Sequence, residues 1–166
     1  DALNRTFLAD SRLKAKLDQP MNPANVDSKQ YAAVYYAGGH GTMWDFPEAA
    51  DLSALAARIY DQGGVVSAVC HGPAGLLNIK LAAGTLLIKG KKLTGFANFE
   101  ETLVMKKSAV PYLLEDALRE RGASYSKALF PFAAHIVTDG RLITGQNPGS
   151  AAGVGHALME VLAGRK

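Results

Sequence analysis

The sequence is poor in cysteine and has no long apolar run. Cys70 is the one cysteine among 166 residues. A single thiol cannot form an internal disulfide, which indicates a reducing compartment, so we expect a cytoplasmic protein. No apolar run approaches the roughly 18 to 20 residues that span a bilayer, and no signal peptide is visible. We therefore expect no membrane partner.

The sequence also has no large excess of positive or negative charge. The formal net charge is +3, and the one dense basic cluster, Lys89, Lys91 and Lys92, has no aromatic side chains between its members. We therefore expect no nucleic acid partner. Hydrophobic residues make up 48% of the chain and charged residues 20%, which is typical of a folded globular protein. At this length we expect one domain, residues 1–166.

Three segments in the first half predict a parallel β-α-β unit. YAAVYYA (residues 31–37) and VVSAV (residues 65–69) are apolar runs of strand length, and both are expected to be buried. Between them, PEAADLSALAARIYDQGG has an apolar helical face that ends at two glycines. Such units place both strands parallel through a right-handed crossover. Ligands bind at the carboxyl ends of such strands, where residues 38–41 and 70–71 lie.

The remaining elements complete an α/β sandwich. An opening helix is expected to end near Pro20. A hairpin turn is expected at Asp139-Gly140. The expected short helices are 72–78, 101–106 and 111–121, a last helix runs from Pro148 to about Leu162, and the expected short strands are 86–88, 92–94, Tyr125, 135–138 and 142–144.

Cys70 stands where the second of these strands ends, in the stretch AVCHGP. A cysteine between a buried strand and a helix start occupies the strand-turn-helix elbow used by nucleophiles. The helix N-terminus favours the reactive thiolate, so we expect a lowered thiol pKa. The alternative is a buried structural thiol, because free cysteine is among the most buried residue types. Its place at the strand end favours the functional interpretation.

The residues around Cys70 supply candidate helpers. His71 can carry protons if the elbow turns both side chains into one cleft, although neighbouring side chains on regular structure diverge. The glycines of Gly38-Gly39-His40-Gly41 free backbone amides that could join the amide of His71 in an oxyanion hole. The alternative is a glycine turn without a ligand. Trp44 and the residues after it are candidates for a pocket wall, although Asp45 could equally cap the next helix.

A carboxylate is needed to orient the histidine. Glu100 and Glu101 both follow the GFANF stretch, and their spacing does not decide between them or exclude a solvated helix start. The four histidines show no spacing of i, i+4 and no cysteine partners, so no metal site is indicated.

Four motifs together resemble the ThiJ/PfpI superfamily, which includes the Parkinson-associated deglycase. They are AGGHGTMWDFPEA, GGVVSAVCHGPAGL, LTGFANFEET and TDGRLITGQNPGSA, in that order. The chain is most similar to the heat-shock chaperone-like branch, whose members are glutathione-independent glyoxalases of the glyoxalase III type. The resemblance implies a flavodoxin-like three-layer sandwich with a mostly parallel sheet, and a class I glutamine-amidotransferase-like domain.

The resemblance also implies a reaction and roles for residues. It implies conversion of methylglyoxal to D-lactate through a cysteine hemithioacetal, without a cofactor or metal. Cys70 is then the nucleophile, His71 the proton carrier and Glu101 the acid of the triad. The amides of Gly39 and His71 form the oxyanion hole. Gly38, His40 and Trp44 are then the remaining candidates for binding a small reactive aldehyde.

One family feature has no counterpart in the sequence. The family has a further glutamate after its first strand, whereas this chain starts beyond that region. We expect a domain that lacks its N-terminal strand-helix-strand, with residues preceding Asp1 in the natural protein. The alternative functions are a stress chaperone, redox sensor or protein deglycase and, second, a cysteine peptidase or amidase. The resemblance allows a homodimer, but the sequence does not define an oligomeric state.

Overall fold

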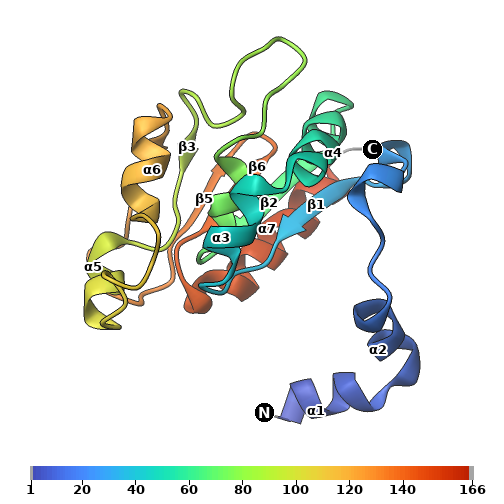
Figure 1. Cartoon of the computed structure of the whole chain (residues 1–166), viewed down its shortest axis with the longest axis horizontal. Coiled ribbons are helices and arrows are strands. Elements are labelled where there is room, and N and C mark those ends of the chain that lie inside the picture. The colour runs from blue at the N-terminus through green and yellow to red at the C-terminus, as the bar shows by residue number, and fades with distance from the viewer. Residues whose placement is uncertain (1, 165–166) are drawn as a thin grey trace.

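The computed structural model describes residues 2–164 and is built on a four-stranded sheet (Figure 1). The strand order is β1 (Ala33–Tyr36), β2 (Val65–Val69), β6 (Leu142–Gly145) and β5 (Ile136–Asp139). β1, β2 and β6 are parallel, and β5 is antiparallel to β6. Every residue of β2 is buried. The second predicted strand is therefore confirmed as the central strand that carries Cys70 at its end.

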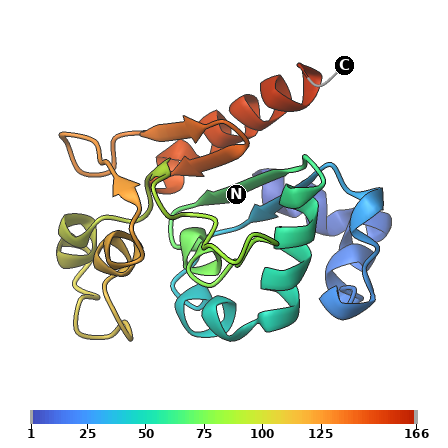
Figure 2. The same ribbon diagram turned by 90° about the horizontal axis from the view of Figure 1, so that it is seen from above.

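Helices cover both faces of the sheet, which gives three layers (Figure 2). α7 (Ala151–Ala163) lies on one face, and α3 (Thr42–Glu48) and α4 (Ala50–Asp61) lie on the other. α4 buries Leu55, Ala56 and Ile59, as its apolar periodicity predicts. The predicted α/β sandwich with a mostly parallel sheet is confirmed.

A smaller lobe extends the sandwich on one side (Figure 1). It holds the parallel pair β3 (Lys92–Leu93) and β4 (Ser124–Tyr125), with α5 (Asn98–Leu103) and α6 (Leu114–Glu120). The amide of Thr94 donates a hydrogen bond to Thr144 Oγ1 of β6 at 2.9 Å. This bond is buried and ties the lobe to the main sheet.

Three sequence predictions about single elements are wrong. The opening helix is two helices, α1 (Ala2–Ala9) and α2 (Ser11–Asp18), because the Asp10 side chain accepts hydrogen bonds from the amides of Arg12 and Leu13 and so caps a second helix. Residues 86–88 form turns with one isolated bridge instead of a strand. β1 is an edge strand in which only Tyr36 is buried.

The predicted hairpin between the last two strands is confirmed. Its two turn residues are Gly140 and Arg141, one position later than the expected Asp139-Gly140, because Asp139 still pairs with Leu142. Gly140 has the positive φ of +60° that such a turn requires. Within residues 2–164, no helix combines the length and the apolar character needed to cross a membrane. The remaining short elements are the 3-10 helices η1 (Pro23–Asn25), η2 (Ser28–Gln30), η3 (Gly72–Leu76) and η4 (Pro148–Ser150).

Candidate active site

Cys70 occupies a strained turn between β2 and η3. Its φ of +61° lies in the left-handed region that L residues rarely adopt. Two backbone hydrogen bonds hold it there: its amide donates to the carbonyl of Gly145, and its carbonyl accepts from the amide of Phe96, both at 2.9 Å. The regular alternation of side chains therefore ends at Cys70, so its side chain and that of His71 can face the same cleft.

Glycines let the backbone approach Cys70 closely. A Cβ added to Gly38 would lie 2.7 Å from the Cβ of Cys70, and one added to Gly72 would lie 2.2 Å from the carbonyl oxygen of Tyr36. Real Cβ atoms do not come so near to other heavy atoms. Both positions therefore require glycine, which explains the small residues in these motifs.

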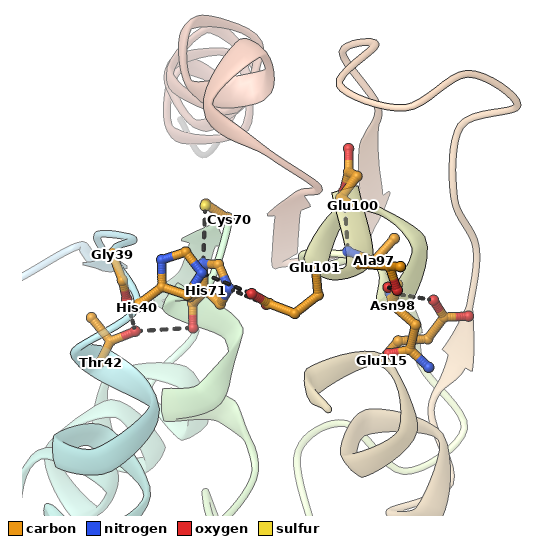
Figure 3. A network of polar contacts seen from close by, with 12 residues as sticks. Gly39, His40, Thr42, Cys70, His71, Ala97, Asn98, Glu100, Glu101 and Glu115 are labelled. Atoms are coloured by element: carbon orange, nitrogen blue, oxygen red, sulfur yellow. Dashed lines mark hydrogen bonds and ion pairs between the residues drawn. The ribbon is translucent and has the colours of Figure 1, made fainter. Parts of the chain in front are cut away.

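Cys70, His71 and Glu101 form a continuous chain of polar contacts (Figure 3). The Cys70 Sγ is 3.3 Å from His71 Nδ1, and His71 Nε2 is 2.8 Å from Glu101 Oε2. His71 and Glu101 are buried, with side chains only 1% and 5% exposed. This is the order of thiol, imidazole and carboxylate that activates a nucleophile.

Glu100, the other candidate acid, points away from the histidines (Figure 3). Its carboxylate accepts hydrogen bonds from the amides of Ala97 and Phe132 and from the side chain of Asn147. These contacts bind α5 to the loop before β5 and to the start of η4. The structure thus brings Glu101 to His71 and gives Glu100 a structural position.

His40 also contacts Glu101. Its Nε2 lies 2.8 Å from Glu101 Oε1, while His71 uses the other oxygen. The ring centroids of the two histidines are 4.1 Å apart. The turn that carries His40 is held by Thr42, whose hydroxyl donates to the carbonyls of Gly39 and His71 at 2.8 and 3.2 Å. The sequence did not predict this second histidine contact.

The electrostatics around Cys70 differ from the sequence expectation. Burial raises the pKa of the Cys70 thiol to about 11, while the amides of His71 and Gly39 act in the opposite direction. The predicted lowering of this pKa is therefore wrong. The element after Cys70 is a five-residue 3-10 helix, which is too short to offset the burial of a thiolate. The amides of Gly39 and His71, the two oxyanion-hole candidates, nevertheless favour the thiolate form of Cys70.

His71 is held in a buried, mostly apolar setting. Burial lowers its pKa, and the hydrogen bond to Glu101 opposes this shift. Phe96 stacks on the imidazole, with ring centroids 4.3 Å apart and an angle of 29° between the planes. The sequence did not single out Phe96, although its place three residues after the end of β3 was a usable signal, since residues near strand ends line ligand sites in such folds.

These groups line a cavity of about 450 Å³. Gly38, Gly39 and His40 lie on its wall beside the elbow, as the sequence predicts for a binding site. Trp44 does not line it, because Trp44 lies in α3 with half its surface exposed, and Asp45 lies in the first turn of the same helix instead of capping α4. The remaining lining residues are Val69, Cys70, His71, Phe96, Val104, Phe132 and Pro148.

The same cluster contains the donor types that metals use. Ligand atoms of His40, His71 and Glu101 all lie within 4.8 Å of one another. Two imidazoles and one carboxylate are a known donor set for zinc. In the structure the three groups also hydrogen-bond to one another, an arrangement that suits proton transfer.

The chain is similar to proteins of known family. The model of the DJ-1/PfpI family matches residues 5–161. The chain belongs to the DJ-1/PfpI family. It is 40% identical over 149 residues to the glutathione-independent glyoxalase HSP31 of Saccharomyces cerevisiae, an alignment that covers 86% of this chain and 62% of that protein. The family assignment confirms the resemblance read from the four motifs.

Two solved structures superpose closely on the chain. The Rapid Encystment Protein 24 kDa of Francisella tularensis has a TM-score of 0.90 at 42% identity, covering 96% of this chain and 70% of that one. Glyoxalase III of Candida albicans has a TM-score of 0.83 at 36% identity, covering 92% and 66%. The chain spans about 62% of the length of the first curated relatives it matches, so their whole-protein activity remains a proposal for this chain.

Proposed function

We propose that this chain carries the catalytic cysteine centre of a glutathione-independent glyoxalase, which converts methylglyoxal to D-lactate. The observation that carries the proposal is the Cys70, His71, Glu101 chain of contacts at the strained end of β2. Relatives named as glyoxalases at 38 to 41% identity, two of them as glutathione-independent or probable glutathione-independent glyoxalases, support the same reaction class. The substrate is a small reactive aldehyde, and the residues described above act on it directly.

The first step is addition of the thiol to the aldehyde. The Cys70 sulfur forms a bond to the aldehyde carbon, and the thiol proton passes to His71 Nδ1. The carbonyl electron pair moves to oxygen, which takes up a proton from a donor on the cavity wall. Because burial disfavours a free thiolate, proton removal is coupled to the attack. The product is a hemithioacetal. The amides of Gly39 and His71, which act on the sulfur, are the donors that would stabilise charge on the oxygen of this adduct.

The second stage is an internal oxidation and reduction. The former aldehyde carbon loses a proton and forms an enediol, and the neighbouring carbon then gains a proton. The first carbon is thereby oxidised to a thioester while the ketone carbon is reduced to an alcohol. Water hydrolyses the thioester, releasing lactate and the Cys70 thiol. The sum is methylglyoxal plus water to lactic acid, so no external oxidant or reductant is consumed.

The experiment is turnover of methylglyoxal without glutathione, with D-lactate measured stereospecifically. Cys70→Ala should abolish lactate formation while the circular dichroism spectrum stays unchanged. Turnover that survives in Cys70→Ala would refute the proposal. Glutaminase and peptide-hydrolysis assays on the same pair of proteins decide the amidase and peptidase alternatives, since either activity would have to vanish with the thiol.

Three further expectations belong with this proposal. We propose that the protein acts in the cytoplasm, that residues 1–166 act as one DJ-1/PfpI domain, and that the chain can form a homodimer. Light scattering behind a size-exclusion column measures the mass in solution. A monomeric mass at micromolar concentration would refute the homodimer.

A further inference from the structure

Two histidines that line the cavity share one carboxylate. His40 Nε2 and His71 Nε2 each lie 2.8 Å from a different oxygen of Glu101. A carboxylate accepts hydrogen bonds, so each Nε2 carries a proton and donates it to Glu101. The two Nδ1 atoms are then the positions at which the rings gain and lose protons. His71 Nδ1 faces the Cys70 sulfur at 3.3 Å.

The two rings differ in their access to the cavity. The side chain of His71 is 1% exposed, whereas that of His40 is 40% exposed and lines the cavity wall. His71 is therefore placed to serve the thiol. The oxygen of a bound aldehyde needs a proton when the sulfur adds, and His40 is the ionisable side chain on the cavity wall that is open to such a group.

The pair accommodates one positive charge and not two. Burial lowers the pKa of His71, and a charge on His40 lowers it further. The ring centroids are only 4.1 Å apart, and Glu101 supplies one negative charge between them. The other ionisable groups nearby are Cys70 and Glu100. The charge of Glu100 favours the charged form of His71, although its carboxylate points away from the histidines. Of the two rings, the exposed ring of His40 is therefore the better place for that charge.

We propose, on the basis of the glyoxalase function above, that His40 is a second catalytic histidine that protonates the substrate's carbonyl oxygen. The C–S bond forms, His40 Nδ1 gives its proton to the developing alkoxide, and His71 Nδ1 takes the proton of the thiol. His40 ends neutral and His71 ends as the imidazolium. The number of protons on the pair is unchanged, and Glu101 neutralises the charge on either ring.

This arrangement explains how a buried thiol with a raised pKa can react. Charging His71 alone would place a new cation in a buried apolar setting. When the charge moves across Glu101 from His40 instead, the site carries the same net charge before and after addition. Loss of the second histidine should therefore slow the addition step itself and leave aldehyde binding nearly unchanged.

The kinetic test compares two variants of His40. His40→Gln keeps an N–H for Glu101 but cannot release a proton, and His40→Ala leaves space for added imidazole. We expect kcat to fall by roughly 10² to 10⁴ in both with KM nearly unchanged, and imidazole to restore activity in His40→Ala alone. His156→Gln, on an exposed position of α7, is the matched control and should keep the wild-type rate. Full turnover in His40→Gln would overturn the proposal.

A second test does not depend on activity. Nuclear magnetic resonance can follow the titration of the His71 ring in the wild type and in His40→Gln. Removing the neighbouring charge should shift the His71 midpoint to higher pH, whereas an unchanged midpoint would overturn the proposal. The two measurements also separate this proposal from the glyoxalase function. If the His71 midpoint shifts as expected but the wild type makes no lactate, the glyoxalase function is refuted and the charge coupling between the two histidines is still established.

Discussion

At the scale of single residues, Cys70 combines a reactive position with an unreactive protonation state. The strained elbow places the sulfur beside His71, yet burial raises the thiol pKa to about 11. The redox-sensor alternative requires an accessible thiolate at neutral pH, because the thiolate is the form that oxidises. The structure therefore favours a thiol that reacts when a substrate and a proton acceptor are both in place.

This raised pKa predicts the pH dependence of alkylation. The acid form dominates below the pKa, so the thiolate fraction of Cys70 should grow about tenfold per pH unit up to about 11. We expect the rate with iodoacetamide to be still rising at pH 10. Free glutathione, with an ordinary thiol pKa, is the control and should level off earlier. A rate for Cys70 that reaches its plateau near pH 6 would contradict the assigned direction.

At the scale of elements, the tight fit between β1 and η3 positions the elbow. Gly72 approaches the carbonyl oxygen of Tyr36 so closely that a methyl group there would lie 2.2 Å from it. Gly155 lies in the middle of α7, and apart from its chain neighbours and the backbone of its own helix, no heavy atom of the described residues lies within 4 Å of its added Cβ. Alanine at Gly72 therefore tests tight packing, whereas alanine at Gly155 tests only the helix propensity of the residue.

We expect opposite effects from alanine at these two positions. Gly72→Ala should lower the free energy of unfolding by about 1 to 3 kcal/mol, because the backbone of β1 must shift. Gly155→Ala should raise it by up to about 1 kcal/mol, because alanine is the better helix former. Urea unfolding followed by circular dichroism measures both. Equal stabilities for the two variants would show that the approach of η3 to β1 is not as tight as described.

Many of the helices and strands could be predicted from the sequence, and the exceptions have physical reasons. The apolar runs and glycine stops located β2 and α4 because burial and helix termination depend on local sequence. The break at Asp10 was missed because a capping side chain competes with helix continuation. The contact of His40 with Glu101 joins residues 61 positions apart, so only the packing of α5 against the elbow reveals it.

At the scale of the whole molecule, the site forms between two parts of the fold. The sandwich carries Cys70, His71 and His40, whereas the smaller lobe carries Glu101 on α5. The triad is therefore complete only when the lobe is docked. Glu115 of α6 helps to hold the lobe together, since its buried carboxylate accepts from the amide of Asn98 at 3.0 Å.

Glu115 also forms ion pairs with two cationic side chains of the lobe. Lys127 Nζ lies 2.9 Å from one carboxylate oxygen, and Arg119 contacts the same oxygen at 3.2 Å. Burial by itself raises the pKa of Glu115, but the hydrogen bonds from Lys127 and the Asn98 amide outweigh it, so the net pKa is lowered from 4.5. A lowered carboxyl pKa contributes stability above about pH 4.5, and this contribution is lost as the pH falls through the folded value.

Glu115→Gln should therefore lose stability in a pH-dependent way. We expect the free energy of unfolding to fall by about 1 to 3 kcal/mol at pH 7, because two cations lose their partner, and the difference from the wild type to shrink toward pH 3. Glu160→Gln, exposed on α7, is the control and should change stability by less than about 0.5 kcal/mol. Urea titrations at pH 7, 5 and 3 measure the trend. At low pH Glu115 of the wild type is protonated and should resemble the glutamine variant. If the difference in unfolding free energy between the two proteins stays constant from pH 7 to pH 3, the charge of Glu115 does not hold the lobe that presents Glu101.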